Sequence, residues 1–248
     1  MIDGREWDTS CFDRSLVRQI CDRRFGVGAD GLIILDNTRG SDFSMKYFNA
    51  DGKEGTMCGN GGRCITVFAR DLGLIGLEAT FRGIDGKHAA SILPNEEVRL
   101  RLKDVDRIGW VEDGYLVDTG SPHFVKFVND LDGIDVETEG REIRNQSRFG
   151  RGGVNVNFIE AGRDSNRIAV RTYERGVESE TLSCGTGVTA SAICAYYHFK
   201  SDILSYHIHT MGGNLNVSFR ADHHTSFTDI YLTGPVSHVF DGSLDITP

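Results

Sequence analysis

Two cysteines in closely similar glycine-rich stretches are the residues of this sequence best suited to chemistry. The stretch "MCGNGGRC" covers residues 57–64, and "LSCGTGVTASAIC" covers residues 182–194. In each, a cysteine (Cys58 or Cys184) is followed by glycine, a small polar residue and a second glycine. A helix that begins at such a cysteine offers unpaired backbone N–H groups and a partial positive charge, which lower a thiol pKa and bind carboxylates. Each stretch therefore predicts a reactive thiol beside a carboxylate-binding turn, which glycine leaves open to a ligand.

Two such thiols facing each other across a cleft would invert a carbon centre. One thiolate removes the α-proton, the opposite thiol supplies a proton, and the helix N-termini stabilise the charge that develops on the carboxylate. This chemistry requires no metal and no redox cofactor. The alternative is that both are small core cysteines at glycine-rich turns, since free cysteine is commonly buried. Because the motif occurs twice, a catalytic role is favoured for Cys58 and Cys184. Cys64 and Cys194 lie inside the predicted helices and are expected in the hydrophobic core.

The two stretches belong to a longer internal repeat. When Cys58 is aligned with Cys184, an offset of 126 residues, four further pairs match: Tyr47 with Tyr173, Glu54 with Glu180, Gly59 with Gly185, and Gly61 with Gly187. A strand-like segment precedes each cysteine, "FSMKYFN" at 43–49 and "IAVRTYE" at 168–174. The chain is therefore predicted to consist of two similar halves.

A helix is expected after each cysteine. In the first half, apolar residues recur with helical spacing between Ile65 and Leu72, and Gly73 is a plausible stop. The second run, "VTASAICAYYHF" at 188–199, is apolar or small nearly all round, which is typical of a buried helix. Both cysteines are thus placed at helix N-termini.

The rest of the sequence is rich in short strand candidates separated by turn residues. We predict an α+β fold with two pseudo-symmetric domains, each a strongly curved, mostly antiparallel sheet wrapped around a central helix. The first domain covers residues 1–103, carries Cys58 and is completed by residues 236–248. The second covers residues 104–235 and carries Cys184.

Composition excludes several other classes of protein. The 248 residues carry a formal net charge of −9, which disfavours non-specific nucleic-acid binding. No apolar run approaches the ~18 residues of a membrane span, and the polar N-terminus is not a signal peptide, so a cytoplasmic location is expected. The six cysteines include no C-x-x-C pair, which disfavours zinc. The stretch "GVGADG" at 26–31 precedes a strand-like segment rather than a helix, so it is interpreted as a turn, not a dinucleotide site.

Six motifs together resemble the diaminopimelate epimerase family. They are "YFNADG", "MCGNGGRC", "TGSPH", "NVNF", "YERG" and "SCGTG", in that order along nearly the whole chain. The resemblance implies the two-domain fold described above and cofactor-independent epimerisation of LL-diaminopimelate to the meso form, in lysine and peptidoglycan precursor biosynthesis. It also implies a homodimer and a small-molecule substrate, with no metal.

The resemblance also implies roles for single residues. Cys58 and Cys184 match the two acid–base residues, and His123 and Glu174 match the residues that tune the thiols. The substrate contacts are expected from Asn49, Gly59, Asn60, Ser121, Asn155, Glu174, Arg175, Gly185 and Thr186. Outside this context, His123 would be an ordinary partly buried histidine, and Glu174 and Arg175 a solvated charge pair.

The sequence departs from the family pattern at three places. Ser121 stands where the family often has asparagine, and Gly31 where some members have glutamine. The family usually carries a strand and a "GND" turn before "MID", whereas this sequence starts at "MIDGR". The first strand and one substrate-binding asparagine are therefore expected to be missing, which predicts a chain that folds but turns over weakly.

Two other functions compete with this one. A proline racemase-like enzyme would also use paired cysteines, but the arginine of "YERG" suits a second carboxylate and favours a dicarboxylate substrate. The phenazine-biosynthesis type of isomerase resembles the fold but lacks the cysteine pair. A catalytically weak protein that only binds a diamino acid is the alternative outside the enzyme classes.

Overall fold

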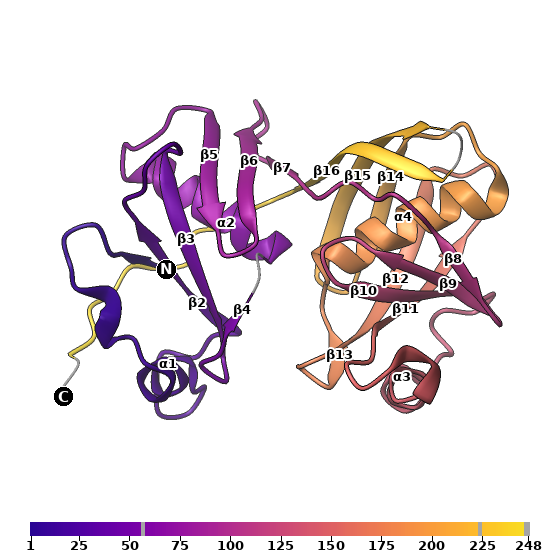
Figure 1. The fold of residues 1–248 in the computed structure, drawn as a ribbon, viewed down its shortest axis with the longest axis horizontal. Coiled ribbons are helices and arrows are strands. Elements are labelled where there is room, and N and C mark those ends of the chain that lie inside the picture. Colours follow the sequence, from indigo (N-terminus) through magenta and orange to yellow (C-terminus); the bar gives the residue numbers. More distant parts are fainter. Residues whose placement is uncertain (56–57, 223–224, 246–248) are drawn as a thin grey trace.

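The computed structural model describes residues 1–55, 58–222 and 225–245, which form two lobes (Figure 1). The first lobe contains helices α1 (Arg14–Cys21) and α2 (Gly59–Asp71), and the second contains α3 (Val136–Arg144) and α4 (Gly185–Phe199). The strands up to the junction are β1 (Ile2–Asp3), β2 (Gly31–Asp36), β3 (Phe43–Asn49), β4 (Glu54–Gly55), β5 (Glu78–Gly83), β6 (Gly86–Ile92) and β7 (Val98–Arg101). Those that follow are β8 (Gly109–Val111), β9 (Gly114–Asp118), β10 (Pro122–Phe127), β11 (Asn155–Ala161), β12 (Arg167–Glu174), β13 (Ser179–Thr181), β14 (Ser205–Thr210), β15 (Gly213–Asp222) and β16 (Ser226–Gly234).

One hydrogen-bonded sheet runs through both lobes. Its order is β1-β2-β3-β5-β6-β7-β16-β15-β14-β12-β11-β10-β9-β8, with β4 on β3 and β13 on β12. Most neighbours are antiparallel; β1–β2, β3–β5, β10–β11 and β12–β14 are parallel. The lobes join where β7 pairs with β16, with Leu100 opposite Leu232. The predicted mostly antiparallel α+β architecture is therefore confirmed.

Helix α4 is the central element of the second lobe. It contacts β9–β12 and β14–β16, so strands surround it. Its side chains are mostly alanine, glycine, serine and threonine, which let the sheet approach closely on all sides. The buried hydroxyls of Thr189 and Ser191 donate to the carbonyls of Gly185 and Gly187 at 2.9 and 2.8 Å, so burial leaves neither unpaired. The prediction of a buried second helix is confirmed.

The internal repeat is also confirmed at the level of elements. In each half, a strand (β3 or β12) pairs with a short strand (β4 or β13), and a helix (α2 or α4) follows. Helix α2 ends at Asp71, and Gly73 adopts a positive φ of 73°, as expected of a stop. Residues 26–30 form an irregular connection between α1 and β2, and Gly31 begins β2, so the stretch is a turn and does not open a helix, as predicted.

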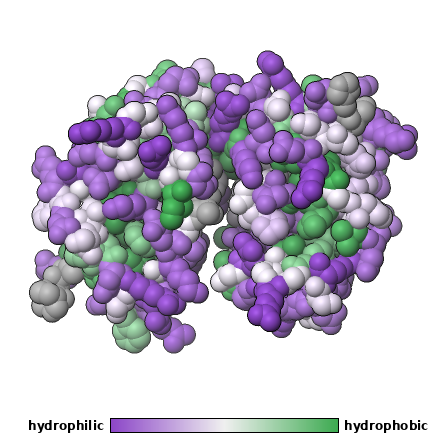
Figure 2. All heavy atoms as spheres, in the orientation of Figure 1, coloured by the Kyte–Doolittle hydropathy of each residue, from purple (hydrophilic) through white to green (hydrophobic). Residues whose placement is uncertain are grey.

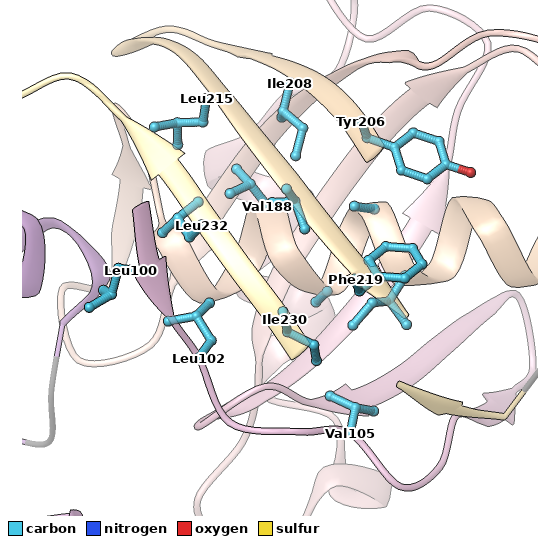
Figure 3. Close-up of a cluster of buried hydrophobic side chains, with 14 of the residues drawn as sticks. Leu100, Leu102, Val105, Val188, Tyr206, Ile208, Leu215, Phe219, Ile230 and Leu232 are labelled. Atoms are coloured by element: carbon cyan, nitrogen blue, oxygen red, sulfur yellow. The ribbon is translucent and has the colours of Figure 1, made fainter. Parts of the chain in front are cut away.

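A single hydrophobic core connects the lobes. Leu100 of β7 lies opposite Leu232 of β16, and both belong with Val188 of α4 to one buried cluster, which Figure 3 shows. The same cluster extends to Ile33 and Ile65 in the first lobe. Because both central helices pack into one core, their relative position is fixed by close packing rather than by a flexible linker.

The segment after β16 runs back from the second lobe toward the first (Figure 1). Val236 packs against the shared core. The assignment of residues 236–248 to the first domain stays a prediction, and residues 246–248 lie outside the described part. Within the described residues, no helix is both long and apolar enough to cross a membrane.

Candidate active site

Cys58 and Cys184 are the N-cap residues of the two central helices. Both have extended backbone conformations, with φ/ψ of −96°/132° and −115°/111°, and neither helix has a side-chain cap. The cysteine carbonyls accept the first intrahelical bonds, from Gly62 N at 2.8 Å and Val188 N at 2.9 Å. The first-turn N–H groups therefore remain available to an anion, as the sequence predicted.

The N-terminal ends of α2 and α4 are in direct contact through glycine. A Cβ built on Gly59 would lie 3.4 Å from the Cα of Gly185, and a Cβ on Gly185 would lie 3.2 Å from the Cα of Gly59. Either Cβ would also lie within 2.9 Å of Cδ2 of Leu232. Across the same contact, Asn60 Nδ2 donates to the carbonyl of Ser183 at 3.5 Å. The two cysteine-bearing turns thus belong to one site. Figure 2 shows a groove between the two lobes on the face in view.

Glu174 is the charged group shared by this site. Burial is the main cause that raises the pKa of Cys58, of Cys184 and of the Tyr47 hydroxyl, and the Glu174 carboxylate raises each of them further, so its charge acts on residues of both halves. Thr181 Oγ1 donates to Glu174 Oε2 at 3.1 Å. Burial raises the pKa of Glu174 itself. Its position at the end of β12 agrees with a role in tuning the thiols.

The expectation that the helix N-termini lower the thiol pKa values is wrong, because both pKa values lie above the ordinary value of a thiol. Burial raises the pKa of Cys58, and burial with the charge of Glu174 raises the pKa of Cys184 to about 12. Backbone N–H groups of Gly61 and Asn60 act in the opposite direction on Cys58 but do not compensate. Desolvation therefore outweighs the hydrogen bonds from the backbone N–H groups, and both thiols favour the protonated form at neutral pH.

This burial predicts slow alkylation at neutral pH. A raised pKa keeps a thiol neutral below that pKa, so the thiolate fraction of Cys184 is expected to rise only at alkaline pH. At pH 7 to 8, iodoacetamide should label exposed Cys11 faster than Cys184. Peptide mapping by mass spectrometry measures both rates in one sample. Faster labelling of Cys184 than of Cys11 would contradict the stated order.

His123 is linked to Cys184 through a hydroxyl. The imidazole is fully buried, and burial lowers its pKa to about 3, so the ring is neutral at physiological pH. Its Nε2 lies 2.9 Å from both Ser121 Oγ and Thr186 Oγ1. Thr186 Oγ1 lies 3.6 Å from the sulfur of Cys184. The structure therefore places His123 on the Cys184 side of the site, with Thr186 between them.

The remaining predicted substrate contacts are divided between the halves. Asn155 joins the second-half cluster: its Oδ1 accepts from Arg175 N at 2.8 Å, and its Nδ2 donates to Ser121 Oγ at 3.1 Å. The Arg175 side chain is exposed at the β12–β13 turn. Asn49 stands apart, exposed at the end of β3, with its backbone bonded to Lys53 and Gly52.

Two buried residues of the site were not predicted. Arg63 donates to the Gly59 carbonyl at 3.2 Å and to Asn60 Oδ1 at 3.1 Å, and its charge partly opposes the rise that burial causes in the pKa of Cys58. Asn157 contacts His123. Both belong to quoted motifs, "MCGNGGRC" and "NVNF", and a polar residue on a predicted buried face was the available signal. Among the described residues, no group of three His, Cys, Asp or Glu side chains is arranged to hold a metal.

Comparison with known proteins places this geometry in a family. The family model described as diaminopimelate epimerase matches residues 1–107 and 115–239. The diaminopimelate epimerase of Flavobacterium psychrophilum is 44% identical over 98% of this chain and 94% of that protein. The corresponding protein of Chlorobaculum tepidum is 41% identical over 93% of this chain and 91% of its own.

Solved structures share the fold at low sequence identity. A phenazine biosynthesis protein of the PhzF family from Bacillus anthracis matches with a TM-score of 0.70 at 16% identity, over 94% of this chain and 89% of that chain. A probable proline racemase from Agrobacterium radiobacter matches with a TM-score of 0.66 at 15% identity, over 91% and 81%. These likenesses establish the fold alone.

Proposed function

The chain belongs to the diaminopimelate epimerase family, and from that membership we propose that it converts LL- into meso-diaminopimelate with Cys58 and Cys184 as its two acid–base groups. The enzyme is an isomerase. The observation that carries the proposal is the contact between Gly59 and Gly185, which brings the two cysteine-capped helix ends into one site. The fold neighbours are too distant in sequence to favour another substrate.

The reaction follows from this arrangement. The substrate α-carboxylate binds at the uncapped N–H groups of α2 and α4, close to Gly59, Asn60, Gly185 and Thr186. The α-ammonium group brings a positive charge into the buried site, which favours loss of one thiol proton to solvent and leaves one thiolate facing one thiol. That thiolate removes the α-proton, the carboxylate accepts charge under the helix N-termini, and the opposite thiol delivers a proton to the other face.

Arg175 is proposed to bind the carboxylate at the far end of the substrate. Its backbone is held by Asn155, and its exposed guanidinium can form the two parallel hydrogen bonds that a carboxylate accepts. Asn49, on the first half, is proposed to contact the same part of the substrate. This distal recognition would distinguish a diamino dicarboxylate from a single amino acid such as proline.

Removing the Arg175 guanidinium is expected to weaken substrate binding. Arg175→Met should raise KM for LL-diaminopimelate about 10–100-fold, the equivalent of ~1.5–3 kcal/mol for hydrogen bonds to a charged group. The thiols are unchanged in this variant, so kcat should fall by a smaller factor than KM rises. Steady-state kinetics measure both constants, and Arg39→Met, at another exposed arginine, is the matched control. An unchanged KM would remove Arg175 from the binding site.

The proposed function is tested by incubating the reduced chain with LL-diaminopimelate and separating the LL and meso forms. Formation of the meso isomer, with no racemisation of L-proline in a parallel assay, is the expected result. Binding of diaminopimelate without meso formation or exchange of the α-proton would support a passive binding protein. Racemisation of proline would support the proline racemase alternative.

The family resemblance extends the proposal to the setting of the enzyme. We propose that it acts in the cytoplasm, in lysine and peptidoglycan precursor biosynthesis, as a homodimer. Light scattering coupled to size exclusion chromatography, under reducing conditions, gives the mass of the particle directly. A monomer with full epimerase activity would contradict the dimer but not the chemistry.

A further inference from the structure

The amide of Asn157 has a fixed orientation. This side chain on β11 is fully buried. Its Nδ2 lies 3.2 Å from the carbonyl oxygen of Phe124, which can only accept, and its Oδ1 lies 3.0 Å from the Thr172 hydroxyl. Exchanging the two amide atoms would set two oxygens against each other at Phe124. Nδ2 is therefore the NH₂ group at this position.

The same NH₂ group determines which nitrogen of His123 carries the proton. Asn157 Nδ2 lies 3.1 Å from Nδ1 of His123. An amide NH₂ has no acceptor capacity, so Nδ1 must accept and carries no hydrogen. The ring is neutral, because burial lowers its pKa to about 3. Its one N–H is consequently on Nε2.

The contacts of Nε2 agree with a donor at that atom. Two hydroxyl oxygens, of Ser121 and Thr186, lie 2.9 Å away and can accept. Asn155 Nδ2 lies farther off, at 3.4 Å, and as a second donor it is directed to Ser121 Oγ at 3.1 Å instead. Once Thr186 Oγ1 accepts from Nε2–H, its own proton is free to point at the Cys184 sulfur, 3.6 Å away.

We propose that Asn157 is a positioning residue that holds His123 in the Nε2–H tautomer and so directs a chain of donors, from Asn157 through His123 and Thr186, toward the sulfur of Cys184. With the opposite tautomer, Thr186 would donate to Nε2 and offer the sulfur only a lone pair. The chain of donors stabilises the thiolate form of Cys184, the form that removes a proton. The catalytic role of this thiolate rests on the proposed function, whereas the tautomer of His123 does not.

The tautomer can be measured without any activity assay. In the full chain labelled with ¹⁵N, long-range ¹H–¹⁵N correlation spectra distinguish the two ring nitrogens, and His123→Gln identifies the signals by their loss. At pH 7 we expect a hydrogen on Nε2 and a bare Nδ1. A hydrogen on Nδ1, or on both nitrogens, would overturn the proposal even in an active enzyme. The expected tautomer in an inactive chain would overturn only the proposed function.

Two substitutions test the part played by Asn157. Asn157→Asp replaces the NH₂ with an acceptor, so Nδ1 should become protonated. Asn157→Leu removes the donor and should leave a mixture of tautomers. Thr172→Val is the matched control. It disturbs the same buried layer but keeps the hydrogen bonds from Asn157 Nδ2 to the Phe124 carbonyl and to His123 Nδ1. In this variant His123 should keep the Nε2–H form. Equal effects of Thr172→Val and Asn157→Leu would overturn the proposal.

The effect on the thiol provides a second readout. In Asn157→Leu, the thiolate-dependent alkylation of Cys184 at a given alkaline pH should fall about tenfold, because a hydrogen bond to a charged sulfur is weakened. Alkylation of Cys58, which caps the other central helix, should keep its rate. Peptide mapping measures both cysteines in each sample. Parallel changes at Cys58 and Cys184 would indicate general loosening of the site and contradict the proposal.

Discussion

Cys58→Ser and Cys184→Ser are each expected to lower kcat/KM for conversion of LL- to meso-diaminopimelate by about 10²–10⁴-fold, the contribution typical of a positioned acid–base group. Inversion needs one group on each face of the α-carbon. A serine hydroxyl fits in place of the thiol but is far less acidic, so it neither forms the base nor supplies the proton. Stopped incubations with chiral separation of the isomers measure the loss.

In each single serine variant, the remaining cysteine should still act as a base on its own face of the α-carbon. It is expected to exchange the α-proton of one stereoisomer with solvent without inverting it. Cys194→Ala is the control, because Cys194 is a fully buried residue of α4 away from the N-cap. That variant should lose some stability and keep its turnover. Full epimerase activity in either serine variant would refute the assignment of two acid–base cysteines.

Gly185→Ala is expected to have the second-largest effect. The added Cβ would lie 2.8 Å from Leu232 Cδ2 and 3.2 Å from the Cα of Gly59, so the two helix ends must move apart. Overpacking of this kind costs about 1–3 kcal/mol of the free energy of unfolding. A displacement of ~1 Å between catalytic groups can cost about 10²-fold in rate. We therefore expect kcat/KM to fall by that factor, measured beside thermal unfolding.

Gly76→Ala is the matched control for this prediction. Nothing lies within 4 Å of a Cβ at Gly76, so this substitution should change neither kcat/KM nor stability appreciably. Gly59→Ala should behave like Gly185→Ala, because the contact is mutual. If Gly185→Ala retained the kcat/KM of the control, close approach of the two helix ends would be unnecessary for catalysis.

Most of the elements that position the thiols could be predicted from the sequence. The strand at 43–49 and both helices are visible in local periodicity, and the small residues of 188–199 indicate burial. Helix α3 could not be predicted, because Gly140 in its interior is unfavourable for a helix. The structure supplies the reason for this glycine: a Cβ there would lie 2.4 Å from Cβ of Tyr173 on β12.

The electrostatics of the site depend on tertiary structure and could not be predicted. A cysteine at a helix N-terminus suggests a lowered pKa. The direction of the pKa shift is instead decided by how deeply the lobes bury the sulfur and by the charge of Glu174. Likewise, the role of Asn157 follows from the parallel register of β10 and β11. There His123 lies opposite Asn155, and Asn157 lies two residues along, on the same face. The register between two strands cannot be read from the spacing of residues in the sequence.

The most direct test of a two-faced site is the fate of deuterium in the first turnovers. Reduced enzyme is mixed with LL-diaminopimelate in heavy water, and both the meso product and the recovered substrate are analysed by mass spectrometry at low conversion. If one thiol removes the proton and the opposite thiol delivers another, the first meso product carries deuterium at the inverted carbon, while the recovered LL substrate carries almost none. Equal deuterium in substrate and product from the earliest times would show a single exchanging base and contradict the account.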